Sequence, residues 1–254
     1  MRDLITYIAV TVLMLAVTPV IAQTPEQYFE TANAHYAEGR YQEAIDDYKK
    51  ILDSNQESAA VYYNLANAHF KLNNVAPSIY YYEKAKQLAP ADSDIKNNAS
   101  FADKMKIDAI TPLPENTLQK WFNSILNIMT TDGWAYATVA FGFLFVILFI
   151  SYYFSVASGK KRLFFVSSVT SLLLALLSLV FAYNAFAKIS KDNPAIVFAA
   201  TSEVKSEPNL KSTQAFILHE GTKVMILETV DNWNKIKLAD GKTGWIPTTD
   251  VRAL

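Results

Sequence analysis

Two long stretches without a charged residue constrain this chain more than any other feature. One runs from Gly133 to Gly159, and the other lies between Arg162 and Lys188. About 20 apolar residues cross a bilayer core as a helix, so each stretch is long enough to span a membrane. Burial in a large soluble domain is the alternative, but no other long apolar segment follows the N-terminus to surround the pair. We therefore predict a transmembrane helical hairpin with helices at residues 133–155 and 163–186.

Basic residues predict the orientation of this hairpin. The loop at residues 156–162 carries Lys160, Lys161 and Arg162. Basic residues beside membrane spans are retained on the cytoplasmic side. We therefore expect a cytoplasmic loop, with the long flanking segments on the other side of the membrane.

The N-terminus supports the same topology. Met1 and Arg2 precede an apolar stretch from Leu4 to Ala22, with Pro19 near its end. This pattern is typical of a secretory signal peptide, which we assign to residues 1–22. An uncleaved anchor helix is the alternative, and both interpretations export the residues that follow. The predicted location is the bacterial inner membrane, with periplasmic domains before and after the hairpin.

A repeat occupies the segment before the hairpin, at residues 23–106. A shift of 34 residues aligns Tyr28 with Tyr62, Ala32 with Ala66, and His35 with His69. This period and its small-residue positions resemble the tetratricopeptide repeat. That resemblance implies an all-α solenoid in which each unit is a pair of antiparallel helices that must stack on its neighbour. We expect five helices, the last near residues 93–106 as a cap.

Solenoids of this class offer a groove lined by the first helix of each repeat. The residues that the register places there are Phe29, Asn33, Tyr36, Tyr63, Asn64, Asn67 and Phe70. One subset of the family clamps a peptide carboxylate, and Asn33 and Asn64 match its asparagines. Its basic positions hold Phe29, Asp94 and Asn98 instead, so we do not expect that clamp. A general peptide or protein groove and a purely intramolecular surface both remain open.

The linker at residues 107–132 carries an amphipathic pattern. Pro112 and Pro114 prevent a continuous helix at its start. The apolar residues that follow recur at helical spacing, and they are Leu118, Trp121, Phe122, Ile125, Leu126 and Met129. The pattern predicts either a helix at the outer membrane surface or a lid on the repeats.

After the hairpin, residues 194–254 read as strands. Val224, Ile226 and Val230 alternate with other residues, and Ile236 and Leu238 face opposite to Lys235 and Lys237. Asp240-Gly241 is a hairpin signal, and Gly244-Trp245-Ile246-Pro247 follows it. This order resembles the bacterial SH3 domain, which implies a small all-β barrel that binds peptides or cell-wall material. Trp233, Trp245 and Pro247 are the predicted groove residues. Both tryptophans could instead be core or rim residues of the barrel; the two interpretations stand equal for Trp233, and a core position is favoured for Trp245.

No signature of catalysis is present in the sequence. Cysteine is absent, and 23 basic residues against 24 acidic ones give no charge excess that predicts nucleic-acid binding. Glycine-rich phosphate loops, zinc motifs and serine elbows are also missing. His35 and His69 share one repeat position and are predicted to be structural, while His219 is predicted at the surface. We expect no enzyme activity, catalytic residue, metal or cofactor.

The order of segments across nearly the whole chain resembles the BatE family of the bacterial aerotolerance operon. Its neighbours include membrane proteins with von Willebrand A domains and a MoxR-type ATPase. The resemblance implies a multidomain, non-enzymatic scaffold of a cell-envelope complex connected with oxygen or stress tolerance. Its expected partners are other envelope proteins, with those von Willebrand A proteins foremost, and the lipid bilayer. The alternative is a tether or sensor that binds peptidoglycan through the SH3-like domain.

Overall fold

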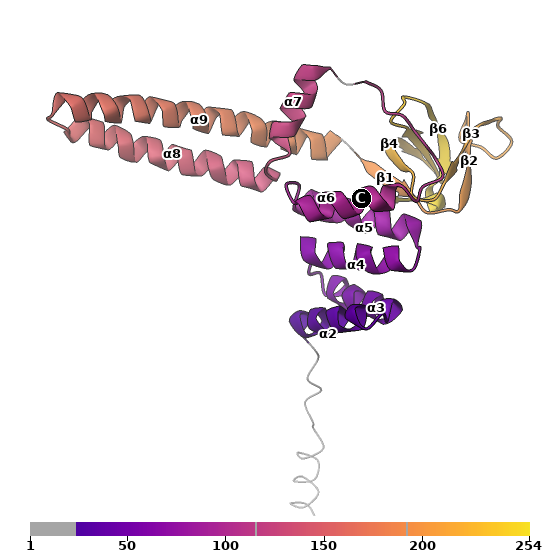
Figure 1. The fold of residues 1–254 in the computed structure, drawn as a ribbon. Coiled ribbons are helices and arrows are strands. Elements are labelled where there is room, and N and C mark those ends of the chain that lie inside the picture. The colour runs from indigo at the N-terminus through magenta and orange to yellow at the C-terminus, as the bar shows by residue number, and fades with distance from the viewer. Residues whose placement is uncertain (1–23, 115, 192) are drawn as a thin grey trace, which may run out of the picture.

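The computed structural model describes residues 24–114, 116–191 and 193–254, so the predicted signal peptide lies outside the described residues. A stack of helices occupies the centre, a long two-helix hairpin extends to one side, and a β domain lies on the other (Figure 1). The predicted fold class of all-α repeats, helical hairpin and all-β domain is confirmed.

Five helices form the repeat region, as the period predicts. They are α2 (Pro25–Ala37), α3 (Tyr41–Asp53), α4 (Ala59–Lys71), α5 (Val75–Leu88) and α6 (Ser93–Asp103). Side-chain caps define three of their starts. Thr24 and Gln27 form a reciprocal capping box on α2, while Ser58 and Asp92 accept backbone N–H bonds at α4 and α6.

Alanine positions let the helices approach closely. Ala32, Ala66 and Ala85 are fully buried, and Tyr48 and Tyr82 fill the adjacent core. The turns also repeat. Gly39 has a φ of 79°, and Asn73, one period later, has a φ of 60°. Asparagine tolerates this left-handed conformation better than most residues, which explains how it replaces the glycine.

The second part of the molecule is the hairpin. Helix α7 (Thr117–Leu126) leads into α8 (Thr131–Phe154), which packs along α9 (Ser158–Lys191). The side of α9 that faces α8 is buried and consists mainly of small residues, with Phe181 as a large exception: the small ones are Ser168, Ser171, Ala175, Ser178 and Ala182. Ser171 Oγ donates to Phe141 O across the pair at 2.8 Å. Large apolar side chains such as Phe143 and Leu173 point outward.

The β domain is a seven-stranded antiparallel sheet in the order β3-β2-β6-β5-β4-β1-β7. Its strands are β1 (Pro194–Val197), β2 (Thr201–Lys205), β3 (Gln214–His219), β4 (Lys223–Val230), β5 (Trp233–Lys237), β6 (Thr243–Pro247) and β7 (Val251–Ala253). A short 3₁₀ turn, η1 (Thr248–Asp250), precedes β7. The predicted turn is present, because Leu238 N donates to Lys242 O at 2.9 Å and Gly241 has a φ of 92°.

One part of the predicted strand pattern is wrong. Val224 is buried, but Val230 is exposed. The pairing of β4 with β5 shifts register between Ile226 and Glu228. Such a bulge changes which residues face the core, so the alternation that begins at Val224 does not continue to Val230.

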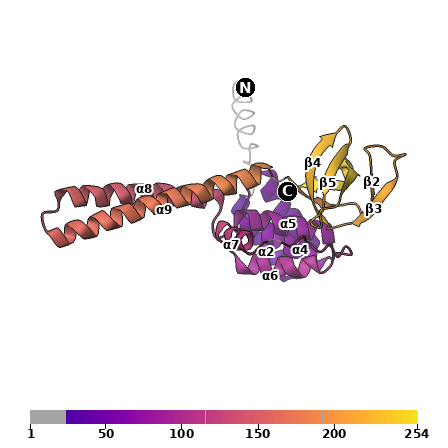
Figure 2. The same cartoon turned by 90° about the horizontal axis from the view of Figure 1, so that it is seen from above.

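The repeats and the β domain pack against each other. Ile196 of β1 is 0 % exposed and belongs to the same apolar cluster as the repeat core. Phe198 meets Tyr80 of α5 edge to face at 5.7 Å, and Arg252 lies over the same ring at 4.5 Å. Figure 2 shows the β domain beside α5 from a second direction. The sequence suggested two separate modules, but these contacts make them one body.

Polar contacts reinforce this docking. Asp108, in the linker, accepts from His219 N at 2.7 Å, from Thr222 Oγ1 at 2.6 Å, and lies 2.8 Å from His219 Nδ1. Partial burial alone would raise the pKa of Asp108, but the hydrogen bonds from Thr222 and His219 outweigh it and hold the pKa below its usual value. His219 is therefore a docking residue, where the sequence predicted a simple surface position.

Candidate functional site

The predicted groove residues form one surface, here called the α2–α4 face. Phe29, Asn33 and Tyr36 come from α2, and Tyr63, Asn64, Asn67 and Phe70 come from α4. These first helices contact each other across the repeats. All seven side chains are half-buried. The face therefore keeps aromatic and amide groups accessible to a partner.

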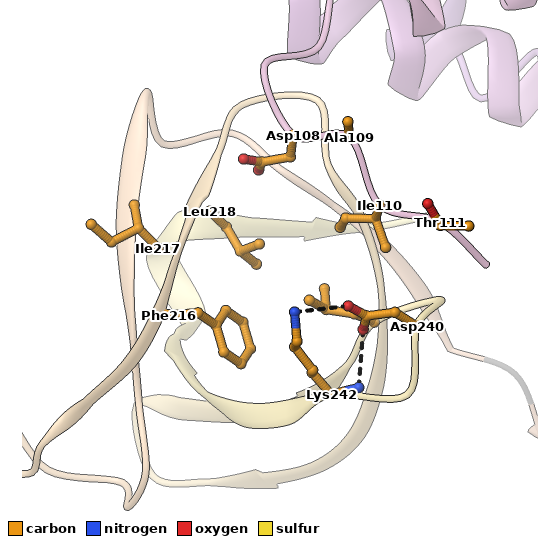
Figure 3. Close-up of a pocket in the computed structure, with 10 residues that line it drawn as sticks. Asp108, Ala109, Ile110, Thr111, Phe216, Ile217, Leu218, Asp240 and Lys242 are labelled. Carbon is orange, nitrogen blue, oxygen red and sulfur yellow. Dashed lines mark hydrogen bonds and ion pairs between the residues drawn. The ribbon is translucent and has the colours of Figure 1, made fainter. Parts of the chain in front are cut away.

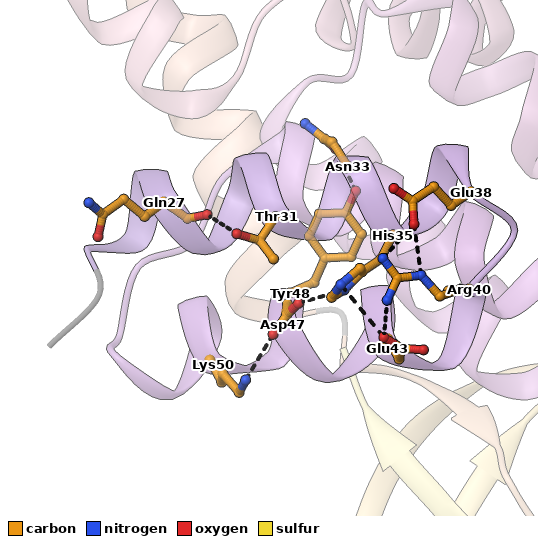
Figure 4. Close-up of polar contacts among 10 residues, drawn as sticks. All are labelled: Gln27, Thr31, Asn33, His35, Glu38, Arg40, Glu43, Asp47, Tyr48 and Lys50. Atoms are coloured by element: carbon orange, nitrogen blue, oxygen red, sulfur yellow. Dashed lines mark hydrogen bonds and ion pairs between the residues drawn. The ribbon is translucent and has the colours of Figure 1, made fainter.

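Asparagines hold this face together through a contact that repeats. Asn33 Oδ1 accepts from the Tyr48 hydroxyl at 2.5 Å, and one period later Asn67 Oδ1 accepts from the Tyr82 hydroxyl. The first of these bonds is visible in Figure 4. Both pairs match at the shift of 34 residues, yet the sequence alone did not show that the partners bond each other. Because the asparagine and the tyrosine both recur after 34 residues, this shared spacing is the signal in the sequence that could indicate their contact.

The two candidate clamp asparagines are engaged with each other. Asn64 Nδ2 donates to Asn33 Oδ1 at 3.0 Å. Farther along, Asn98 Nδ2 donates to the Tyr63 hydroxyl at 2.9 Å. These bonds hold the amides in fixed orientations, so the face presents a preorganised polar surface. They do not supply the cations that a carboxylate clamp needs.

The repeat-related histidines occupy equivalent positions with different partners. His35 Nδ1 lies 2.9 Å from Asp47 Oδ2, as Figure 4 shows. His69 is buried and stacks on Tyr81, the repeat equivalent of Asp47, with centroids 5.6 Å apart. Burial, with a smaller contribution from the charge of Lys49, lowers the pKa of His69 to about 4. Both histidines therefore pack within the repeat.

Buried His69 predicts a loss of stability in mild acid. Its pKa is depressed on folding, so between about pH 6.5 and pH 4 the unfolded chain binds a proton that the folded chain does not. This group's contribution is complete above that window and declines as pH falls, by on the order of 3 kcal/mol at about pH 4. Denaturant unfolding followed by circular dichroism, at neutral pH and at about pH 4.5, measures it. His69→Phe should lose less stability on acidification than the native chain; equal losses would contradict the prediction.

The β domain carries a second accessible surface, here called the tryptophan face. It consists of Trp233 and Lys235 on β5 with Trp245 and Pro247 on β6. In the antiparallel register Trp233 lies opposite Pro247, and Lys235 lies opposite Trp245. Lys235 Nζ is 5.7 Å from the centre of the Trp245 ring. The three predicted groove residues therefore share one side of the sheet.

The favoured core position for Trp245 is wrong. Trp245 is half-buried, whereas its neighbours Gly244 and Ile246 are buried. Successive residues of a strand face opposite sides, so the side that holds Ile246 in the core turns Trp245 outward. Strands β2 and β6 approach closely at Gly244, because a side chain there would collide with Val204.

A cleft of about 330 Å³ separates the linker from the β domain (Figure 3). Phe216, Leu218 and Ile110 line its apolar part. Its charged residues are already paired within the chain, Asp240 with Lys242 and Asp108 with His219. We assign no ligand to this cleft. Across the residues that the structure describes, no cluster of three histidines or carboxylates could hold a metal ion.

Comparisons with known protein families support both the predicted tetratricopeptide repeats and the predicted SH3-like domain. Residues 29–93 match the family model of the tetratricopeptide repeat, and residues 200–252 match that of the bacterial SH3 domain. A comparison with the curated proteins finds no match. Among solved structures, the chain is similar to YrrB, described as a TPR protein with an unusual peptide-binding site. The identity is 15%, the TM-score is 0.31, and the match covers 65% of this chain and 75% of that one.

The two family-model matches indicate a class of protein. Tetratricopeptide repeats and SH3 domains are typically non-enzymatic interaction domains. The chain joins a region of tetratricopeptide repeats and one SH3 domain to two helices that are long and apolar enough to cross a membrane. It has the architecture of a protein-interaction adaptor.

Proposed function

We propose that this chain is a membrane-anchored adaptor of the bacterial cell envelope that holds partner proteins at the membrane. One observation carries the proposal. The β domain docks on α5, so the α2–α4 face and the tryptophan face both remain accessible on a single body. An adaptor needs two such surfaces in a fixed relation, and the docking provides it.

The packing of the hairpin supports the membrane anchor. Small residues of α9 meet α8, while large apolar side chains such as Phe143, Ile147 and Leu173 face away from the pair. Helices in lipid associate through small residues because lipid tails solvate the large ones. In water the same outward side chains would form an exposed apolar patch far larger than a soluble domain tolerates.

Sidedness follows from the basic residues at the tip. Lys160, Lys161 and Arg162 begin α9 where the two helices meet, and basic residues favour the cytoplasmic side. The body formed by the repeats and the β domain joins the opposite end of the hairpin (Figure 1). The proposed location is therefore the inner membrane, with this body in the periplasm.

The proposed partners are other envelope proteins. The resemblance of the whole chain to the BatE family suggests membrane proteins with von Willebrand A domains and a role in aerotolerance or stress resistance. The matched repeat and SH3 families support a protein partner of some kind. The finer assignment is a proposal that partner identification tests.

Photo-crosslinking in living cells tests the adaptor directly. A photoreactive amino acid at Tyr36 reports on the α2–α4 face, and the same group at exposed Lys49 on α3 is the matched control. We expect adducts with an envelope protein from position 36 and not from position 49. Identical adducts from both positions, or none from either, would contradict the proposal.

Binding of the same partner should depend on the aromatic side chains of the α2–α4 face. Replacing Tyr36 and Phe70 by serine removes accessible rings of the kind that dominate interfaces. We expect the binding free energy to weaken by about 2 kcal/mol, which is about thirtyfold in affinity, measured by co-purification of the identified partner. A Lys49→Ser variant should bind normally; a double variant that binds equally well would exclude the α2–α4 face.

The tryptophan face favours a second candidate function, a tether to peptidoglycan. Two tryptophans and Lys235 share an accessible sheet surface, and aromatic rings of this kind suit a flat ligand. Sedimentation of the detergent-solubilised full chain with purified wall tests it. A tether predicts retention that Trp233→Ser and Trp245→Ser abolish. Absence of retention would leave the protein adaptor as the remaining function.

A further inference from the structure

Helix α7 lies across the end of the hairpin. Figure 1 shows it running nearly perpendicular to α8 and α9, and Figure 2, turned by 90°, shows it close to end-on while the hairpin stays in view along its length. A helix perpendicular to two membrane spans lies parallel to the membrane plane. This orientation is the first of three observations about α7.

The second observation is that packing fixes the depth of α7 relative to the spans. Phe122 stacks on Phe181 of α9 with centroids 5.3 Å apart, and Leu126 is buried in the same cluster. Trp134, in the first turn of α8, stacks on Phe181 at 4.8 Å and donates from Nε1 to Leu126 O at 3.1 Å. The helix is thereby held at the level where the spans begin, and these contacts are with the hairpin, not with a lid position over the repeats.

The third observation is that part of the apolar face of α7 remains uncovered. Leu118 is 81% exposed and Trp121 is 68% exposed, although both lie on the same helical face as Phe122 and Ile125. The opposite face carries Gln119, Lys120 and Asn127. The hairpin therefore buries one half of an amphipathic helix and leaves the other half open.

We propose that this open half, Leu118 and Trp121, inserts into the interface between lipid headgroups and acyl chains. The inference rests on the proposed membrane anchor, because it takes the hairpin axis as the membrane normal. An amphipathic helix in that plane buries its apolar face to the headgroup boundary, where tryptophan is favoured. A bilayer that solvates the outer faces of α8 and α9 continues at this depth to α7. The occupant is thus lipid, and α7 sets the height of the repeat body above the membrane.

Spin labelling of the full chain in lipid vesicles tests the proposal. The chain has no cysteine, so each single substitution gives one label. Labels at Leu118→Cys and Trp121→Cys probe the open half, and Lys120→Cys is the matched control on the opposite face. Ile147→Cys, in the middle of α8, reports on the membrane anchor itself, and Leu88→Cys reports on the aqueous surface of the repeats.

Collision rates with oxygen, which concentrates in lipid, and with a water-soluble nickel chelate give the depth of each label. We expect the oxygen-to-nickel ratio at positions 118 and 121 to be several-fold higher than at 120 and 88, and lower than at 147. Ratios at 118 and 121 equal to those at 88, with a high ratio at 147, would overturn the interfacial helix and leave the anchor intact. Low access to both reagents at 118 and 121 would also overturn it, because a second copy or another protein surface would then cover them. A low ratio at 147 would refute the membrane anchor.

Discussion

Replacing Asp108 by alanine is expected to release the β domain from the repeats. The carboxylate binds two N–H groups of His219 and the hydroxyl of Thr222, and its side chain is mostly buried. Hydrogen bonds to a charged group contribute about 1.5–3 kcal/mol each, and removing the acceptor also leaves buried donors unpaired. We expect the docking to weaken by about 3 kcal/mol or more. Hydrogen exchange should rise at residues 219–223 and in the facing part of α5.

Asp240→Ala is the control for this prediction, because Asp240 lines the same cleft as Asp108 but pairs with Lys242 of its own hairpin. The Asp240→Ala variant should leave hydrogen exchange at α5 unchanged. If Asp108→Ala also leaves it unchanged, apolar contacts such as Ile196 hold the two parts together without the linker carboxylate.

Acid should also weaken the docking of the β domain on the repeats. The pKa of Asp108 is depressed on folding, so its contribution to stability is present above the pKa of an unfolded aspartate, about 4, and is lost as pH falls through its lower folded value. The domains should therefore separate at lower pH than the window assigned to His69. Hydrogen exchange across a pH series distinguishes the two transitions.

Replacing Ala66 by leucine is expected to destabilise the repeats. Ala66 has no exposed surface, and its carbonyl accepts from Ser78 Oγ at 3.1 Å, so α4 and α5 are in close contact there. Extra methylene groups in such a site cost about 1–3 kcal/mol. Because each repeat is stabilised only by its neighbours, the loss should spread through the stack. The far-ultraviolet circular dichroism and the thermal midpoint of the full chain should both fall.

Ala34→Leu provides the matched control, since Ala34 lies two positions from Ala32 on α2 but is exposed. It should melt like the native chain. A normal thermal midpoint in Ala66→Leu would mean that α4 and α5 can separate without loss of the fold, against the close packing described above.

Local periodicity explains which features the sequence could predict. The shift from Tyr28 to Tyr62 predicted paired helices because helical repeats bury residues at fixed intervals, and alternation predicted the inward Ile236. The same alternation, applied around Ile246, places Trp245 outward, as the structure does. The bulge after Ile226 has no comparable signal in a single sequence.

Contacts between distant segments were beyond the sequence. Asp108 and His219 are 111 positions apart, and nothing near either residue indicates that they meet. The docking of Ile196 into the repeat core is equally non-local. Amphipathicity predicted α7, but its packing on Phe181 of α9, which supports the proposed membrane-surface position over the lid, has no signal in the sequence.

Accessibility of single cysteines in intact cells tests the central claim, a membrane anchor with both interaction surfaces on the outer side. The native chain has no cysteine to interfere. Cysteines at Lys49 on the repeats and at Lys237 on the β domain should react with a membrane-impermeant maleimide added outside. A cysteine at Ser158, beside the basic tip of the hairpin, should react only after the cells are opened. Reaction of position 158 in intact cells, or protection of 49 and 237, would contradict the account.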